Sequence, residues 1–245
     1  MRIAIITDVH ENFEALRRAI GLLKKSGYEL LICLGDITGY SFDFYKHHPD
    51  ANACIDLLRE EADIVLAGNH DYFTCRRLSS YQLENGLPLN WYDLHPTVQK
   101  SISGKKFWLY ESELLPQLSS ENQQFLLDLK ELYIYDAFDV KLLLSHFVMP
   151  DLVGAGTAMP QRISQLQPHF RFMEENNCRI SFTGHFHPDG ITIADRYFHT
   201  IVGTRTFKLK RKPSIVLCPA LSGNNSGSCI IFDSANDEII PIILG

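Results

Sequence analysis

Residues 1–10 read Met-Arg-Ile-Ala-Ile-Ile-Thr-Asp-Val-His, an apolar run that ends in Asp8 and His10. Short apolar runs bounded by turn residues are typical of strands buried on both faces, as in a parallel sheet. In open α/β sheets, ligands bind in the crevice outside the carboxyl ends of the strands. This stretch therefore predicts an α/β fold and makes Asp8 and His10 candidate site residues.

Four further apolar runs end in the same way, at residues 30–34, 64–67, 140–145 and 180–183. The residues that follow them are Gly35-Asp36, Gly68-Asn69-His70-Asp71, His146 and Gly184-His185-Phe186-His187. A single Asp or His at a strand end has little weight. Five strands that bring such residues to one edge of a parallel sheet predict a site for metal ions. Mixed imidazole and carboxylate ligands suit manganese, iron, nickel or zinc better than calcium or magnesium.

The first seventy residues have a β-α-β-α-β pattern, which indicates a parallel sheet with right-handed crossovers. Asn12 is the expected N-cap of the first helix, and Gly27 its end. The second helix is expected near residues 52–61.

The rest of the chain divides into two parts. Residues 72–138 are expected to form a helical excursion beside the site, with one helix capped at Ser119 or Ser120. Another helix is expected at 161–176. From Gly190 onward, short apolar runs without helices predict an antiparallel meander that packs as a second sheet on the first, with helices outside. We expect one domain over residues 1–245.

Composition limits the possible partners. An apolar fraction of 45% easily supports a core, and the net charge of −6 makes nucleic acid an unlikely main partner. The basic run at residues 208–212 is interpreted as solvated surface, with a patch for an anionic substrate tail as the alternative.

The six cysteines show no CxxC motif or close framework, which favours a reducing compartment. The first apolar stretch is too short for a signal peptide or a membrane span. We expect a soluble, cytoplasmic protein without a membrane partner.

The ordered motifs between residues 8 and 187 resemble the signature of the calcineurin-like metallophosphoesterases, with every element present. The segments Asp36-Ile-Thr-Gly-Tyr40 and Leu118-Ser-Ser-Glu-Asn122 look like the small bacterial and archaeal branch described as YfcE-like or diadenosine-tetraphosphatase-like. The resemblance implies a four-layer αββα sandwich of two mixed β-sheets flanked by helices.

The resemblance also implies two divalent metal ions, with manganese the most expected. It assigns Asp8, His10 and His187 to one ion, and Asn69, His146 and His185 to the other, with Asp36 as the bridge. It further implies that a metal-bridged hydroxide attacks phosphorus without a covalent enzyme intermediate. Asn69 and His70 are expected to bind substrate, and His70 to act as general acid or to stabilise charge on the phosphoryl oxygens.

Three positions depart from the family pattern. Protein phosphatases of the family carry Gly-Asp-x-Val-Asp-Arg-Gly, whereas this chain has Gly39 in place of the second Asp, which orients the histidine, and lacks the Arg. Glu11 replaces a common glycine and should weaken the binding of an anion if it points inward. Residues 219–223, Pro-Ala-Leu-Ser-Gly, stand where Asn-Pro-Gly-Ser is expected.

The expected function is hydrolysis of a small phosphodiester, phosphomonoester or nucleotide. The alternatives are a dinucleoside polyphosphate pyrophosphatase and a non-catalytic scaffold. Because all ligands and His70 are retained, an enzyme is favoured. The oligomeric state is left open. The other histidines and the two arginines after the third motif are expected to be surface or core residues: His47, His48, His95, His169, His199, Arg76 and Arg77.

Overall fold

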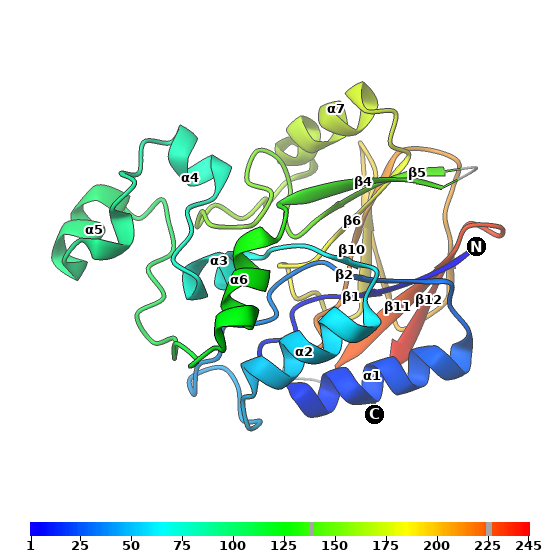
Figure 1. Cartoon of the computed structure of the whole chain (residues 1–245). Coiled ribbons are helices and arrows are strands. Elements are labelled where there is room, and N and C mark those ends of the chain that lie inside the picture. Colours follow the sequence, from blue (N-terminus) through cyan, green and yellow to red (C-terminus); the bar gives the residue numbers. More distant parts are fainter. Residues whose placement is uncertain (138–139, 224–226) are drawn as a thin grey trace.

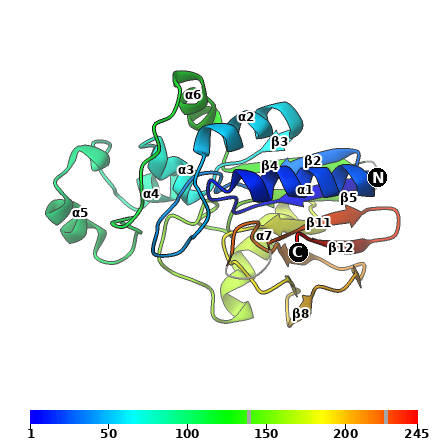
Figure 2. The same cartoon turned by 90° about the horizontal axis from the view of Figure 1, so that it is seen from below.

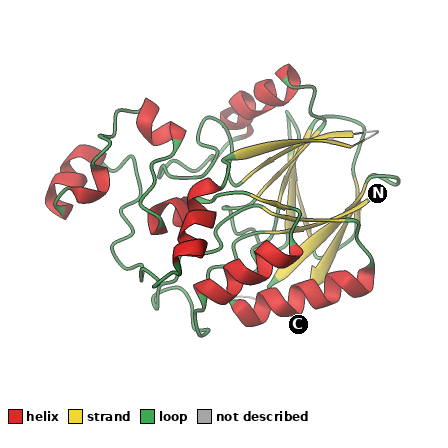
Figure 3. Ribbon diagram, in the orientation of Figure 1, coloured by secondary structure: helices red, strands yellow, loops and turns green. Residues whose placement is uncertain are grey.

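A computed structural model of the protein describes residues 1–137, 140–223 and 227–245. The described strands form two six-stranded sheets, with helices on the outer faces (Figure 1, Figure 3). The first sheet has the order β3-β2-β1-β11-β12-β9, and its strands are β1 (Arg2–Ile6), β2 (Leu30–Cys33), β3 (Ile64–Val65), β9 (Phe207–Lys208), β11 (Ser228–Asp233) and β12 (Glu238–Ile243). The second has the order β4-β5-β6-β10-β7-β8, and its strands are β4 (Leu132–Ala137), β5 (Val140–Ser145), β6 (Ile180–Thr183), β7 (Ile191–Ala194), β8 (His199–Gly203) and β10 (Ser214–Leu217). Both sheets contain parallel and antiparallel pairs, which confirms the expected fold class.

Alternate residues of the central strands face two different apolar layers, because successive side chains of a strand point to opposite faces. In β1, Ile3 and Ile5 lie in the core between the sheets, whereas Ala4 and Ile6 lie in the core under the helices. The same alternation occurs in β5. Burial on both faces explains why these strands are continuously apolar in sequence.

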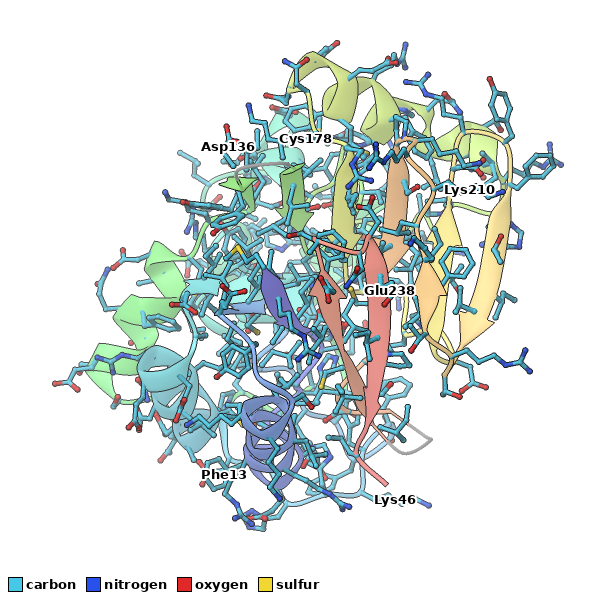
Figure 4. The ribbon with its side chains drawn as sticks, turned by 90° about the vertical axis from the view of Figure 1, so that its right-hand side faces the viewer. Phe13, Lys46, Asp136, Cys178, Lys210 and Glu238 are labelled. Carbon is cyan, nitrogen blue, oxygen red and sulfur yellow. The ribbon has the colours of Figure 1, made fainter. Side chains whose placement is uncertain are left out.

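Helices cover both outer faces of the two sheets. The first sheet is covered by α1 (Phe13–Ser26), α2 (Ala51–Glu61) and α6 (Ser120–Asp128), and the second by the 3-10 turn η2 (Ile163–Leu166) and α7 (Gln167–Glu175). Figure 2 shows α1 and α2 next to one another, and the two helices are in contact. In Figure 4, α1 with Phe13 and α7 near Cys178 lie on opposite sides of the two sheets.

The helix caps follow the sequence. Asn12 and Ser119 each accept a hydrogen bond from a backbone N–H in the first turn of α1 and α6. The helix expected at 161–176 becomes regular only at Gln167, because the preceding turn is a 3-10 helix.

Between β3 and β4 the chain forms an excursion that projects from the sheets at the side where α4 and α5 lie in Figure 1. Its elements before α6 are α3 (Asn69–Thr74), α4 (Ser80–Glu84), the 3-10 turn η1 (Trp91–Asp93) and α5 (Pro96–Ser103). A small apolar cluster of Leu87, Trp91 and Phe107 stabilises it. The excursion leaves and returns at neighbouring positions, because the N–H of Ala67 donates to the carbonyl of Lys130 at 2.9 Å.

The expectation that the five apolar runs share one parallel sheet is wrong. Strands β1, β2 and β3 belong to the first sheet, and β5 and β6 to the second. A run that is apolar on both faces indicates burial but does not specify the neighbouring strands. The C-terminal strands likewise do not form a separate sheet, since β11 pairs with β1 and β10 pairs with β6.

The expected helical excursion up to residue 138 is also wrong at its end, because β4 begins at Leu132. This strand lies at the edge of the second sheet, where Tyr133 and Asp136 are exposed. The exposed side chains interrupt the apolar pattern that indicates a buried strand.

Candidate metal centre

The predicted site residues of both sheets meet at one end of the sandwich. Strands β1, β2 and β3 run in parallel, as do β5 and β6, and the predicted residues follow their carboxyl ends. In Figure 1, β1 runs from the N-terminus toward the side where α3 lies, so the site and the excursion share this end.

The first group of side chains consists of Asp8, His10 and His187. Nε2 of His187 lies 3.0 Å from Oδ1 of Asp8 and 3.3 Å from Nε2 of His10. Nε2 of His10 lies 4.0 Å from the carboxylates of both Asp8 and Asp36. These atoms converge closely enough to hold one metal ion.

The second group consists of Asp36, His146 and His185. Nε2 of His146 lies 3.0 Å from Oδ2 of Asp36. Oδ1 of Asn69 lies 2.9 Å from Nδ1 of His185, which adds an amide oxygen to this group. Asp36 therefore lies between the two groups, in the position predicted for a bridging ligand.

Backbone carbonyls orient two of these histidines. Nδ1 of His10 donates to the carbonyl of Gly39 and Nδ1 of His146 to that of Leu34, both at 2.9 Å. A proton on Nδ1 leaves Nε2 as the atom available to bind a metal. Nε2 of His146 is fully buried and makes no hydrogen bond, so a metal ion would supply the partner it lacks.

The carboxylates give this buried site a strong attraction for cations. Burial raises the pKa of Asp8, but His187 and His146 outweigh it and hold this pKa below its ordinary value. Burial lowers the pKa of His146, but Asp36 outweighs it and raises that pKa to about 9. Burial lowers the pKa of His10 and of His185 to about 3. The neutral imidazoles of His10 and His185 next to ionised carboxylates are in the protonation states in which these groups bind metals, whereas His146 would release its proton when a metal binds.

The backbone at the ligands is in a conformation that most residues avoid. Asp8, His10, Asp36, His185 and His187 have φ between 44° and 64°. The left-handed conformation costs a residue other than glycine roughly 1–2 kcal/mol. Strain of this kind persists where the surrounding structure enforces it, and it gathers at functional sites.

Two glycines allow close approach at the site. A Cβ on Gly68 would lie 2.0 Å from Oδ1 of Asp36, which explains the glycine that begins the third motif. Gly39 has φ of 99°, and a Cβ there would lie 2.5 Å from Cβ of His70. The aspartate that protein phosphatases carry at this position would not fit beside His70 in this structure.

His70 is oriented by a residue that the sequence did not reveal. Its Nδ1 lies 2.5 Å from Oε2 of Glu113, whose side chain is 4% exposed. Burial lowers the pKa of His70, but Asp36 and Glu113 outweigh it and raise that pKa to about 9. Tyr110 packs edge-on against His70 and accepts a hydrogen bond from Nδ2 of Asn69. Both Glu113 and Tyr110 come from the irregular part of the excursion, for which no motif exists.

Two nearby acidic residues stabilise loops rather than face the site. Asp71 accepts hydrogen bonds from the backbone N–H groups of Ile37, Thr38 and Gly68. Glu11 accepts one from the N–H of Gly39, and burial raises its pKa to about 7. Glu11 therefore does not point into the candidate metal centre.

A cavity of about 770 Å³ opens at this site. Its wall includes six predicted residues: His10, Asp36, Asn69, His70, His185 and His187. Arg76 instead pairs with the exposed Asp93, and Arg77 stacks over Tyr72 at 4.4 Å, so neither lines the cavity. His169 is a core residue that hydrogen-bonds Ser181, as expected for a histidine outside the motifs.

Residues 1–189 match the family described as Calcineurin-like phosphoesterase. The match covers more than half of the 245 residues, so the chain belongs to the calcineurin-like phosphoesterase family. The resemblance seen in the motifs is thereby confirmed. Together with the Asp/His groups, the family supports a metal-dependent phosphoester hydrolase.

Two solved structures have a similar fold. A metallophosphoesterase from Sphaerobacter thermophilus has a TM-score of 0.67 at 20% identity, over 99% of this chain and 88% of that chain. A hypothetical protein from Pyrococcus horikoshii OT3 has a TM-score of 0.61 at 15% identity, over 99% of this chain and 87% of that chain. At these identities the likeness shows the fold alone.

A curated relative, an uncharacterized protein of Methanocaldococcus jannaschii, is 39% identical over 70 residues. The match covers 29% of this chain and spans about a quarter, 26%, of that relative's length. No helix among the described residues is long and apolar enough to cross a membrane.

Proposed function

We propose that the protein is a dinuclear-metal-dependent phosphoesterase that hydrolyses a small phosphodiester, phosphomonoester or nucleotide. The observation that carries the proposal is the proximity of two ligand groups, since Asp36 belongs to one and lies 4.0 Å from His10 of the other, at a cavity that His70 also lines. The three oxygen ligands and four imidazoles proposed for the two ions suit manganese, iron, nickel or zinc. Manganese is proposed first because the family resemblance implies it.

One ion would be held by Asp8, His10, Asp36 and His187, and the other by Asp36, Asn69, His146 and His185. Two ions bound by these groups lower the pKa of a water molecule and neutralise charge on the phosphoryl oxygens. Asn69 and His70, which line the cavity beside Asp36, are proposed to contact the phosphoryl group.

The proton needed by the leaving group comes from His70 in this proposal. Hydrolysis joins the oxygen of water to phosphorus and breaks the bond from phosphorus to the alcohol oxygen, which then takes up a proton. Glu113 binds Nδ1 of His70, so Nε2 is the atom that can donate. General acid catalysis of this kind typically contributes 10²–10⁴-fold.

Two other functions use the same fold. A dinucleoside polyphosphate pyrophosphatase would need the same metal ions but a longer, more highly charged substrate. A non-catalytic scaffold would not need His70, whose orientation by a buried carboxylate favours an enzyme. We further propose a cytoplasmic location, because all six cysteines are free and buried.

The test is turnover of a panel of phosphate esters by the manganese-loaded protein, with the bound metal counted. We expect His70→Asn to keep two metal equivalents and the fold, and to lower kcat by about 10²-fold or more. The loss should be smaller for nitrophenyl esters, whose leaving group barely needs a proton. His48→Asn, at an exposed position, is the control. Full occupancy by metal without turnover of any ester would favour the scaffold.

A further inference from the structure

The segment at residues 107–110 contributes aromatic side chains to the wall of the cavity. Phe107 and Leu109 pack into the small apolar cluster of the excursion, whereas Trp108 and Tyr110 line the cavity. The segment is held in place by Trp108, whose N–H donates to the carbonyl of Ala155 at 3.1 Å.

Of the four Phe, Tyr and Trp rings that line the cavity among the described residues, two are exposed to solvent. Tyr45 stacks on His10, and Tyr110 packs on His70. Phe44 and Trp108 are 68% and 41% exposed, and within the described residues neither pairs with another ring or with a cation. A single exposed aromatic residue is ordinary on a surface. Two that line the same cavity as a metal centre form a platform for a flat ligand group.

The cavity wall carries little positive charge. Among the described residues that line it there is no lysine or arginine, and none of the residues outside the description, 138–139 and 224–226, is of either type. Its acidic members are Asp36, Glu113 and Asp189. A bound phosphate ester would thus find its positive partners only in the metal ions and His70. An ester with two negative charges would leave one of them poorly paired in a buried site, which makes its binding free energy less favourable.

We propose that the substrate is a phosphodiester in which the group that stays on phosphorus carries a planar aromatic ring, as in a nucleotide diester, and that this ring stacks on Trp108. The proposal rests on the hydrolase function proposed above and narrows its substrate class. A diester has one negative charge, whereas a monoester at neutral pH approaches two and a dinucleoside polyphosphate has more. The reaction consumes one water molecule and yields a phosphomonoester and an alcohol.

The experiment compares three esters with one leaving group, using manganese-loaded protein. They are thymidine 5′-(p-nitrophenyl) phosphate, methyl p-nitrophenyl phosphate and p-nitrophenyl phosphate. We expect kcat/KM for the thymidine diester to exceed that for the monoester by at least about 10-fold. Trp108→Ala should lower kcat/KM for the thymidine diester by about 10-fold, mainly through KM, as expected from the loss of one base–aromatic stack.

The loss caused by Trp108→Ala should be several times larger for the thymidine diester than for the methyl diester, and Trp108→Phe should restore most of it. Tyr197→Ala, which removes an exposed ring that does not line the cavity, is the control. Equal losses on the two diesters would overturn the stacking role. Faster turnover of the monoester would overturn the diester preference while leaving the hydrolase intact. No turnover of any of the three at full metal occupancy would overturn the proposed function itself.

Discussion

Asp36 lies near both ligand groups, since its Oδ2 lies 3.0 Å from Nε2 of His146 and 4.0 Å from Nε2 of His10. Asp8, of the first group, is farther from His146, at 3.8 Å. Asp36→Asn keeps the shape of the side chain but removes its charge. We expect bound manganese to fall from two equivalents to below one, and turnover to become undetectable, as measured by elemental analysis and ester hydrolysis. Asp43→Asn, on an exposed loop, should keep both ions. Two full equivalents in Asp36→Asn would contradict a bridging role.

Glu113 sets the protonation of His70 through a contact of 2.5 Å. Its negative charge is one of those that raise the pKa of His70, so Glu113→Gln lowers that pKa. His70 then loses its proton at a lower pH, and the basic limb of the kcat profile moves to lower pH, with kcat reduced by about 10-fold or more.

Glu111 provides the matched control for this variant, because it lies two residues away and its side chain is 71% exposed. Glu111→Gln should leave the pH profile of kcat unchanged. If Glu113→Gln also leaves the profile unchanged, Glu113 does not orient the acid.

At the scale of elements, the excursion determines how large a substrate can reach the metal centre. Four residues in the segment 107–113 of the excursion line the cavity, Trp108, Tyr110, Ser112 and Glu113. Ser112 also contacts Ser41, in the loop after β2, at 3.3 Å. We expect kcat/KM for small phosphodiesters to exceed that for a folded phosphoprotein or a long DNA duplex by at least about 100-fold. Comparable rates on the large substrates, measured with the same protein, would contradict this prediction.

The elements differ in how well the sequence predicts them. The metal-binding residues follow buried strands, so a local pattern of apolar run and polar end locates them. The orienting Glu113 and the ring of Trp108 lie in an irregular segment. Their positions depend on the packing of Phe107 and Leu109 into a distant cluster. That packing leaves no periodic signal in the sequence.

The arrangement of strands was predictable only in part, for a related reason. A continuous apolar run indicates that β1 and β5 are each buried on both faces, and both are. It does not say that β11 and β10 pair with β1 and β6, because these contacts join residues far apart in the chain.

At the scale of the whole molecule, the candidate metal centre draws its residues from both sheets. Asp8, His10 and Asp36 follow strands of the first sheet, whereas His146 and His185 follow strands of the second. Metal that binds only the folded protein stabilises it, by about 2.7 kcal/mol at a free concentration 100 times Kd. We therefore expect chelation to lower the Tm measured by calorimetry, and added manganese to restore it. If chelation and added manganese change the Tm of Asp36→Asn by the same amount, the stabilising metal binds at another site.

The excursion begins and ends at adjacent positions, where the N–H of Ala67 donates a hydrogen bond to the carbonyl of Lys130. An insertion that departs from and rejoins its host at adjacent residues can change in length at small entropic cost, since each doubling of a flexible loop costs only about 0.6 kcal/mol. Most of this insertion, from Cys75 to Leu129, supplies none of the metal-binding residues but carries Trp108 and Glu113. A change in the length or sequence of this insertion can therefore alter the wall of the cavity while every proposed metal-binding residue stays in place.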